Sequence, residues 1–516
     1  MRLIGVVGSG STTVYAPLLV YENHESLAKE EQLVIINDKK RFIKYLGVLR
    51  RVHRYEPFLD PRKRTSYVDN PTLVDHGVMP HTSAWITLIG SIQNKMLSDV
   101  QLPPNPGSYV YVIESPEDLD LRISVKESIV VGKHKYSGIE IPLDVSAIPL
   151  HTVVVGATGT GKSRLVKALV DEIINKTNYS VIIFDHTGMD YVPYYEGHTV
   201  QASKIVLDPL LITDLILERT DLERRTYEPY VLTATLAYMI QTCKYPESST
   251  ELQQSSLSSF MKNTQDRYVS QQRDLFEQLG EVDTEKLMQK AAAMGMRWDK
   301  DEFKDLISKT VSYMRGKESA RLRLSIAFDI RLGNSFFDML SERTTLPRAV
   351  VSKVLKEKLV VVDLSSEDIL VRKYIVSAII SELWKIIESK REVINVVAVV
   401  DEAHNYACRF CGEPHKAISR VAREGRKWGF GLVLATQRMI DIDPEIRGNI
   451  NTVFFSKLQT PSDFNEISAY MDLGGLTEAS LAVLSKREFF VAGLMNTLRV
   501  PILLKVREVP SPGTTT

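Results

Sequence analysis

The chain is 516 residues long, and its 64 Lys and Arg side chains balance its 64 Asp and Glu side chains. A formal net charge of zero excludes a polycationic surface, so any contact with nucleic acid needs a local basic lining. The apolar share of 44% and the charged share of 25% are typical of a globular protein, and the length predicts two to four domains.

Segments that direct a protein to or through a membrane are not evident in the sequence. No run of about 18 apolar residues occurs, and the N-terminus does not show the charged and then apolar pattern of a signal peptide. The three cysteines are too few for a disulfide framework. We therefore expect a cytoplasmic protein with no membrane contact.

Residues 1–145 have the pattern of a small β-barrel. Short runs rich in Val, Ile and Leu alternate with clusters of Gly, Pro, Asn and Asp, as in strands joined by turns. The runs lie at residues 3–7, 32–36, 46–52, 109–113, 128–131 and 139–145. Residues 39–64 also hold ten Lys and Arg against two acidic residues. This basic stretch is either a solvated face or a docking surface for DNA or a protein.

From residue 146 onward, apolar runs alternate with helical patterns. Runs suited to buried parallel strands lie at residues 152–155, 181–184, 359–362, 396–400, 432–435 and 453–455. Such strands, separated by helices, form the sheet of an α/β domain. We expect this α/β core to comprise residues 146–204 and 346–505. Residues 205–345 predict an inserted helical bundle with a surface connection at 251–259, and residues 506–516 a C-terminal tail.

A glycine-rich loop joins the first of these strands to a helix, and it is the most specific motif in the chain. It has the form G-x-x-x-x-G-K-S, with residues Gly156, Ala157, Thr158, Gly159, Thr160, Gly161, Lys162 and Ser163. The glycines let successive backbone N–H groups face a phosphate at the positive end of the helix. We expect Lys162 to reach the β- and γ-phosphates and Ser163 to ligate Mg²⁺. The loop predicts a nucleoside triphosphate site.

Acidic residues follow three of the predicted strands. Asp401 and Glu402 follow residues 396–400, where Asp401 is expected beside Mg²⁺ and Glu402 is placed to polarise the attacking water. Asp363 is a rival to Asp401, but it is followed by a leucine, so we expect it to cap the next turn. Asp185 ends the second strand, and either a role in the cofactor and metal site or a capping role remains open for it.

Two further candidates complete the predicted catalytic set. Gln437 follows the strand at residues 432–435, at the edge of the sheet where ligands bind, and is expected to sense the γ-phosphate or the water. Arg426 lies at the end of a basic helix that breaks at Gly429. An arginine inserted by a neighbouring subunit accelerates phosphoryl transfer strongly, so we predict Arg426 as this trans-acting finger and Arg423 as the next candidate.

Cysteine and histidine gather between these motifs. His404, Cys408, Cys411 and His415 lie within twelve residues, which allows a zinc site or a Cys408–Cys411 disulfide. The ligands lie closer together than in the usual zinc finger, so an ordinary loop is the main expectation. If this loop lines a channel, Arg409 and Lys416 are both available for phosphate contacts.

Taken together, these strings resemble the HerA family of the HerA/FtsK superfamily. The likeness spans nearly the whole chain and rests on residues 3–8, 46–49, 143–163, 401–404, 423–427 and 435–438. It implies an α/β fold with a P-loop NTPase core of the RecA-like, additional-strand type, an N-terminal barrel of the ATP-synthase kind and the inserted helical bundle. One departure is the string at residues 185–191, which is one residue longer than the family pattern.

The resemblance also implies a function. It implies an ATP- and Mg²⁺-dependent homohexamer that moves double-stranded DNA, acts in end processing and recombinational repair in archaea, and works with a NurA-type nuclease. One alternative is a secretion-type ATPase that pumps protein or another substrate. A second is a scaffold without motor activity that recruits a nuclease, although such a scaffold has no need of Glu402.

Overall fold

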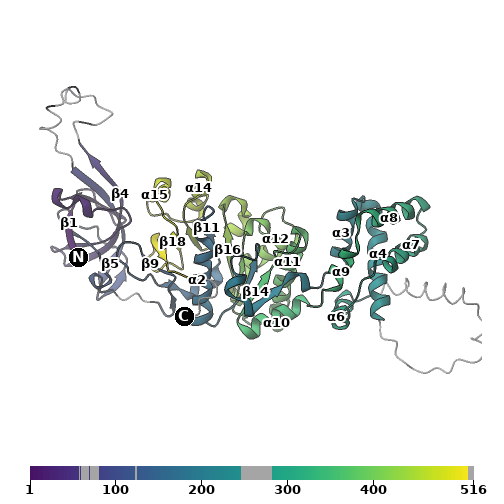
Figure 1. Cartoon of the computed structure of the whole chain (residues 1–516). Coiled ribbons are helices and arrows are strands. Elements are labelled where there is room, and N and C mark those ends of the chain that lie inside the picture. Colours follow the sequence, from purple (N-terminus) through teal and green to yellow (C-terminus); the bar gives the residue numbers. More distant parts are fainter. Residues whose placement is uncertain are drawn as a thin grey trace, which may run out of the picture. The chain divides into compact units, whose positions relative to one another are not determined.

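The computed structural model describes residues 1–56, 59, 69, 72, 81–121, 125–245 and 282–509. The chain divides into two compact units (Figure 1). The first combines Met1–Ile183 with Arg391–Thr516, and the second comprises Phe184–Lys390. The expected surface connection at residues 251–259, the end of the predicted tail and part of the basic stretch lie outside the described residues.

The first unit begins with a closed antiparallel barrel, as the sequence predicts. Its strand order is β2-β1-β7-β3-β4-β5, and a pairing between β2 and β5 closes the ring. The strands are β1 (Arg2–Val7), β2 (Tyr15–Val20), β3 (Leu33–Asp38), β4 (Ile43–Tyr55), β5 (His81–Gln93) and β7 (Tyr109–Val112), and β6 (Met96–Ser98) pairs with the end of β5. Apolar side chains such as Leu18, Ile36 and Ile86 fill the interior.

Two of the expected barrel strands belong to other sheets. β8 (Ser128–Ile129) pairs with β10 (Leu143–Asp144) in a separate two-stranded sheet. β9 (Gly132–His134) pairs with β19 (Ile502–Val506) at the edge of the ATPase sheet. The apolar runs at residues 128–131 and 139–145 therefore each contain a short strand, but these strands are not part of the barrel. The predicted domain boundaries stay predictions.

A buried arginine connects the barrel to the rest of the first unit. Arg50 leaves the barrel wall and pairs with Glu31, with Nε 3.1 Å from Oε1. Its guanidinium also donates to the carbonyl oxygens of Leu473, Gly474 and Pro501. Arg50 is only 2% exposed, so this member of the basic stretch is a structural residue and not part of a solvated face.

Parallel strands carry the predicted motifs of the first unit. β11 (Thr152–Val155) lies between β16 (Phe430–Thr436) and β17 (Thr452–Phe455), and β15 (Val396–Val400) lies outside β16. All four run in parallel, so their carboxyl ends meet at one edge. β18 (Glu488–Gly493) and β19 extend the sheet in the antiparallel sense. Helices of this unit are α2 (Lys162–Lys176), α12 (Glu413–Glu424), α13 (Pro444–Arg447), α14 (Pro461–Tyr470) and α15 (Glu478–Ala482).

The second unit is mainly helical. The chain enters it through β12 (Ser180–Asp185), and its strands β13 (Thr199–Gln201) and β14 (Leu359–Asp363) pair in parallel. Its helices are α3 (Pro209–Thr220), α4 (Arg224–Cys243), α6 (Thr284–Met294), α7 (Lys300–Tyr313), α8 (Glu318–Arg331), α9 (Asn334–Ser341), α10 (Pro347–Glu357) and α11 (Ile369–Lys390). The described part of residues 205–345 is thus helical, as expected. None of the helices in the described ranges has the length and apolar character that a membrane span requires.

Candidate active site

The glycine-rich loop has the backbone that its sequence demands. β11 ends at Val155, and α2 begins at Lys162. Gly159 and Gly161 have φ angles of 81° and 100°, in the left-handed region that glycine adopts without strain. Backbone hydrogen bonds hold the loop on both sides. The N–H of Ala157 donates to the carbonyl oxygen of Lys457, and the carbonyl oxygen of Thr160 accepts from the N–H of Arg487. This conformation is therefore built into the fold.

The start of α2 offers the groups that phosphate binding needs. The N-cap of the helix is Gly161, which has no side chain to occupy the N–H groups of the first turn. Lys162 Nζ donates to the carbonyl of Gly156 at 2.9 Å, so the ammonium lies over the loop. Ser163 follows in the first helical turn and is partly buried. The loop and helix form a cradle that suits the phosphates of a nucleotide.

Asp401 and Glu402 follow the end of β15, the strand next to β16, at the same edge of the sheet. β15 ends at Val400, and Asp401 is buried with 5% exposure. Glu402 has a φ of 44°, a left-handed conformation that is costly for a side chain with a Cβ. Such strain persists where the surrounding structure fixes it, and here it turns the Glu402 side chain toward Gln437.

Gln437 joins the loop to the acidic pair. It follows the last residue of β16, Thr436, which pairs with Val155 of β11. The Gln437 amide nitrogen donates to Glu402 Oε1 at 3.2 Å, and its amide oxygen accepts from the hydroxyl of Thr158 at 3.2 Å. Residues from three separate motifs thus form one hydrogen-bonded chain. The structure brings them together as predicted, and their catalytic roles stay predictions.

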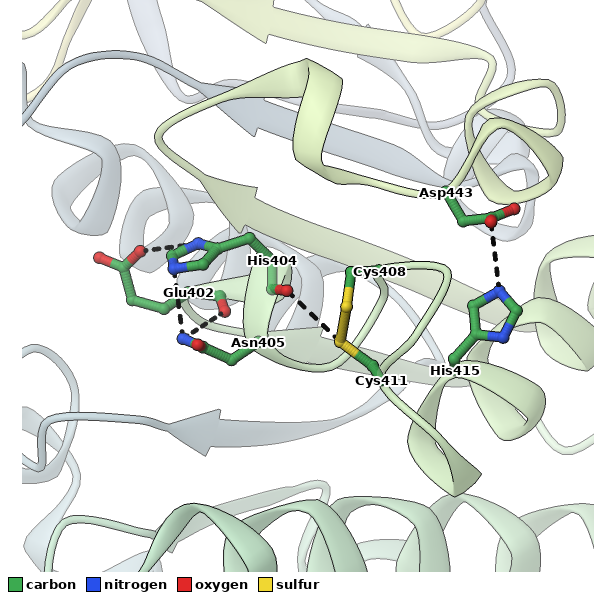
Figure 2. Close-up of a disulfide and its surroundings, with 7 residues drawn as sticks. All are labelled: Glu402, His404, Asn405, Cys408, Cys411, His415 and Asp443. Carbon is green, nitrogen blue, oxygen red and sulfur yellow. Dashed lines mark hydrogen bonds and ion pairs between the residues drawn. A yellow bond between two sulfur atoms is a disulfide. The ribbon is translucent and has the colours of Figure 1, made fainter.

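Side chains without a predicted catalytic role extend this hydrogen-bonded chain. His404 Nδ1 lies 3.4 Å from Glu402 Oε2, and Asn405 donates to the carbonyl of Glu402 (Figure 2). Gln459 donates to the amide oxygen of Gln437 at 3.2 Å. The position of His404 in the Asp-Glu-Ala-His string was a signal for its contact with Glu402. Gln459 lies beyond β17 in a segment that matches no motif, so nothing in the sequence marked it.

The two arginine candidates differ in their surroundings. Arg423, in the last turn of α12, pairs with Glu445 at 2.8 Å. Arg426 lies in the short 3-10 helix that follows, which ends at Gly429 with a φ of 66°, and its side chain is exposed. An exposed guanidinium is what a neighbouring subunit's site requires, whereas Arg423 is engaged within its own chain. The predicted order of the two candidates agrees with this geometry.

Asp185 and Asp363, in the second unit, both cap turns. Asp185 is fully buried, and its carboxylate accepts the N–H groups of Thr187, Gly188, Tyr191 and Val192. Asp363 accepts from the N–H and the hydroxyl of Ser365. The capping role expected for Asp363 is confirmed. For Asp185 the structure shows the capping role, and its predicted role in binding the cofactor stays a prediction.

The main expectation for the cysteine-containing loop is wrong, because Cys408 and Cys411 form a disulfide. Their Cα atoms lie 5.2 Å apart, within the range that a disulfide can bridge. The two histidines turn to opposite sides, His404 toward Glu402 and His415 toward Asp443 (Figure 2). The four side chains therefore do not converge on one metal ion, and the zinc alternative does not fit this arrangement.

Comparison with known proteins supports the resemblance to the HerA family. The family described as "Helicase HerA, central domain" matches residues 129–383. The DNA double-strand break repair helicase HerA of Sulfurisphaera tokodaii is 27% identical over 443 residues, which cover 83% of this chain and 78% of the relative. The same-named protein of Pyrococcus furiosus is 24% identical over 443 residues, covering 82% of this chain and 77% of the relative.

Among solved structures, VirB4 of Thermoanaerobacter pseudethanolicus aligns with a TM-score of 0.44 at 17% identity, over 75% of this chain and 98% of that chain. The bacterial conjugative coupling protein TrwB aligns with a TM-score of 0.41 at 12% identity, over 76% of this chain and 92% of that chain. The α/β sheet, the glycine-rich loop and the family match together confirm the predicted P-loop NTPase fold. The chain is an ATP-hydrolysing enzyme, and over most of its length it is similar to proteins of the HerA family.

Proposed function

We propose that this protein is an ATP-driven translocase and helicase that acts on double-stranded DNA during the repair of DNA ends. The observation that carries the proposal is the hydrogen-bonded chain from Thr158 through Gln437 to Glu402. It links the nucleotide cradle directly to the acid that polarises water, which a protein that only binds nucleotide does not need. The relatives named as double-strand break repair helicases supply the DNA substrate and the repair context.

In the proposed mechanism each residue of the site has a separate role in ATP hydrolysis. The backbone of residues 156–161 and the ammonium of Lys162 hold the phosphates, and the hydroxyl of Ser163 together with the buried Asp401 would hold Mg²⁺. Bound Mg²⁺-ATP supplies the phosphoryl group that is transferred to water. Glu402 accepts a proton from that water, and Gln437 fixes the Glu402 carboxylate and orients the water.

A further group must come from another subunit. Transition-state charge on a phosphoryl group is stabilised strongly by an arginine, which contributes about 10³- to 10⁵-fold in rate. Arg426 is exposed at the end of its helix, so it is suited to enter the site of a neighbour. We infer that the active form is a ring with its sites at the subunit interfaces, and specifically a homohexamer.

The proposed ring moves duplex DNA through its centre. Because the formal net charge is zero, the basic groups that contact phosphates must be concentrated along the path of the DNA. Affinity for duplex DNA is then independent of sequence and falls steeply with salt. A NurA-type nuclease that cuts the delivered strands is the proposed partner.

The proposal is tested by asking whether the protein displaces streptavidin bound at the end of a DNA duplex. The protein is mixed with a linear duplex that carries streptavidin on a terminal biotin, and release of streptavidin is measured with ATP, with ADP and with the Glu402→Gln variant. Release that requires ATP and Glu402 supports a motor. DNA binding with ATP turnover but no release contradicts translocation, and turnover in the absence of any DNA binding favours a pump for another substrate.

A further inference from the structure

The disulfide closes a tight turn between β15 and α12, which we call the Cys408–Cys411 turn. The N–H of Cys411 donates to the carbonyl of Cys408 at 3.0 Å, so the four residues form a hydrogen-bonded β-turn that the disulfide crosslinks. The two residues at its tip are Arg409 and Phe410. None of the roles assigned above to the nucleotide site uses either of them.

The base of the turn is anchored, while its tip is exposed. Cys411 is 4% exposed, and the backbone of Ala407, just before the turn, bonds to Ala403 and to Asp443. In contrast, Phe410 is 89% exposed, and Arg409 is exposed beside it, with its guanidinium carbon 6.0 Å from the centre of the Phe410 ring. Such a crosslinked turn restrains the backbone that presents both side chains, so little backbone freedom is left to lose on binding.

The chemistry of the tip matches a nucleic-acid backbone. In the described part of the chain Arg409 has no acidic partner, so its guanidinium is available to a phosphate. The nearby Lys416 is already paired with Glu413 at 2.6 Å, which leaves the positive charge of Arg409 uncompensated. A planar aromatic ring that projects into solvent next to this cation can pack on a sugar or a base.

The turn is also close to the catalytic acid. Glu402 Oε2 lies 3.4 Å from His404 Nδ1, and the carbonyl oxygen of His404 lies 3.5 Å from the Sγ of Cys411 (Figure 2). A disulfide sulfur carries no proton, so the second contact is one of close packing and not a donated hydrogen bond. Two contacts thus separate the crosslinked turn from the carboxylate that polarises water.

We propose that the Cys408–Cys411 turn is a contact for duplex DNA, in which Arg409 pairs with a backbone phosphate and Phe410 packs on the adjacent sugar. The disulfide holds the backbone that presents both side chains. This inference rests on the proposed function, since DNA must be the substrate. It adds a residue-level contact that is physically connected to Glu402, so that a bound duplex acts on the segment that carries the catalytic acid.

A matched pair of double variants tests the contact. The test variant combines Arg409→Ala with Phe410→Ala, and the control combines Arg323→Ala with Leu322→Ala, which removes an arginine and a large apolar side chain from adjacent exposed positions elsewhere. Binding of a labelled linear duplex is measured by fluorescence anisotropy over a series of salt concentrations, after circular dichroism has shown that each variant is folded.

The test variant is expected to bind duplex about tenfold or more weakly at low salt, with a shallower dependence of affinity on salt, while the control binds as the unchanged protein does. Equal affinity and equal salt dependence for test variant and unchanged protein would overturn the contact but leave the proposed function standing. Absence of duplex binding by the unchanged protein would overturn both. A changed native mass with unchanged DNA affinity would make the tip a contact between subunits, which also overturns the proposal.

A third variant, which combines Cys408→Ser with Cys411→Ser, tests the role of the disulfide. Both tip side chains remain in this variant, but the turn is no longer crosslinked. We expect duplex affinity to fall by about three- to tenfold, less than when the tip is removed, because order must then be gained on binding. An affinity equal to that of the unchanged protein would show that the disulfide does not hold the contact.

Discussion

Replacing Gln437 with leucine removes the link between the glycine-rich loop and Glu402, the proposed catalytic base, while nearly preserving the side-chain volume. In the structure the Gln437 amide nitrogen donates to Glu402 Oε1 at 3.2 Å and lies 3.5 Å from Oε2. A hydrogen bond to a charged group contributes about 1.5–3 kcal/mol. At about 1.4 kcal/mol for each factor of ten, loss of this contact in the transition state lowers kcat by about 10- to 150-fold.

Steady-state ATP hydrolysis at saturating duplex DNA measures this effect. We expect the KM for ATP to change little, because in the proposed mechanism the phosphates are held by the backbone of residues 156–161 and by Lys162, whereas Gln437 contacts this loop through the hydroxyl of Thr158. Gln101→Leu, at an exposed glutamine elsewhere in the chain, is the matched control and should hydrolyse ATP at the unchanged rate. A kcat for Gln437→Leu that is unchanged or increased would refute the idea that Gln437 positions Glu402 for catalysis.

Three further substitutions test other parts of the account. Arg426→Ala should lower the kcat of ATP hydrolysis by about 10³-fold or more, whereas Lys427→Ala, at the exposed neighbouring residue, should leave it unchanged. Equal steady-state rates for the two variants would refute the proposal that Arg426 acts in the site of a neighbouring subunit. Arg50→Met leaves Glu31 buried without its partner and should lower the free energy of unfolding, measured in urea, by about 3 kcal/mol. A loss below about 1 kcal/mol would contradict a stabilising role for the buried contacts of Arg50. Burial lowers the pKa of His151 to about 4, so the stabilisation from the neutral ring is complete above about pH 6.5 and is lost as the pH falls toward 4. The stability advantage over His151→Gln should therefore shrink by about 3 kcal/mol between pH 7 and pH 4 in urea titrations, and an advantage independent of pH would contradict this linkage.

The parallel strands of the nucleotide site could be predicted because their sequences leave little choice. β11 and β15 consist of valine apart from Thr152 and Ala398, they are buried on both faces, and each is followed at once by polar or glycine residues. Since parallel strands end at one edge, the proximity of Glu402 and Gln437 followed from the sequence alone. The barrel strands β2 and β5 were missed, because Pro17 interrupts one and the other is rich in Ser, Thr and Gly.

Other features depend on contacts between distant parts of the chain. Arg50 belongs to a basic stretch, and nothing local distinguishes it from its exposed neighbours. Its partner carbonyls lie 423 residues away at Leu473 and 451 residues away at Pro501, so only the folded chain shows that it is buried. Likewise, Cys408 and Cys411 allowed a metal site, a disulfide or neither, until the directions of His404 and His415 were known.

The central claim is that the protein couples ATP hydrolysis to double-stranded DNA in a ring of subunits. The most direct test is steady-state ATP hydrolysis with and without linear duplex DNA, with native mass measured on the same sample. The account predicts a particle of ring size whose hydrolysis rises on addition of duplex and is abolished by Glu402→Gln. A monomer that hydrolyses ATP at the same rate with and without duplex would contradict it.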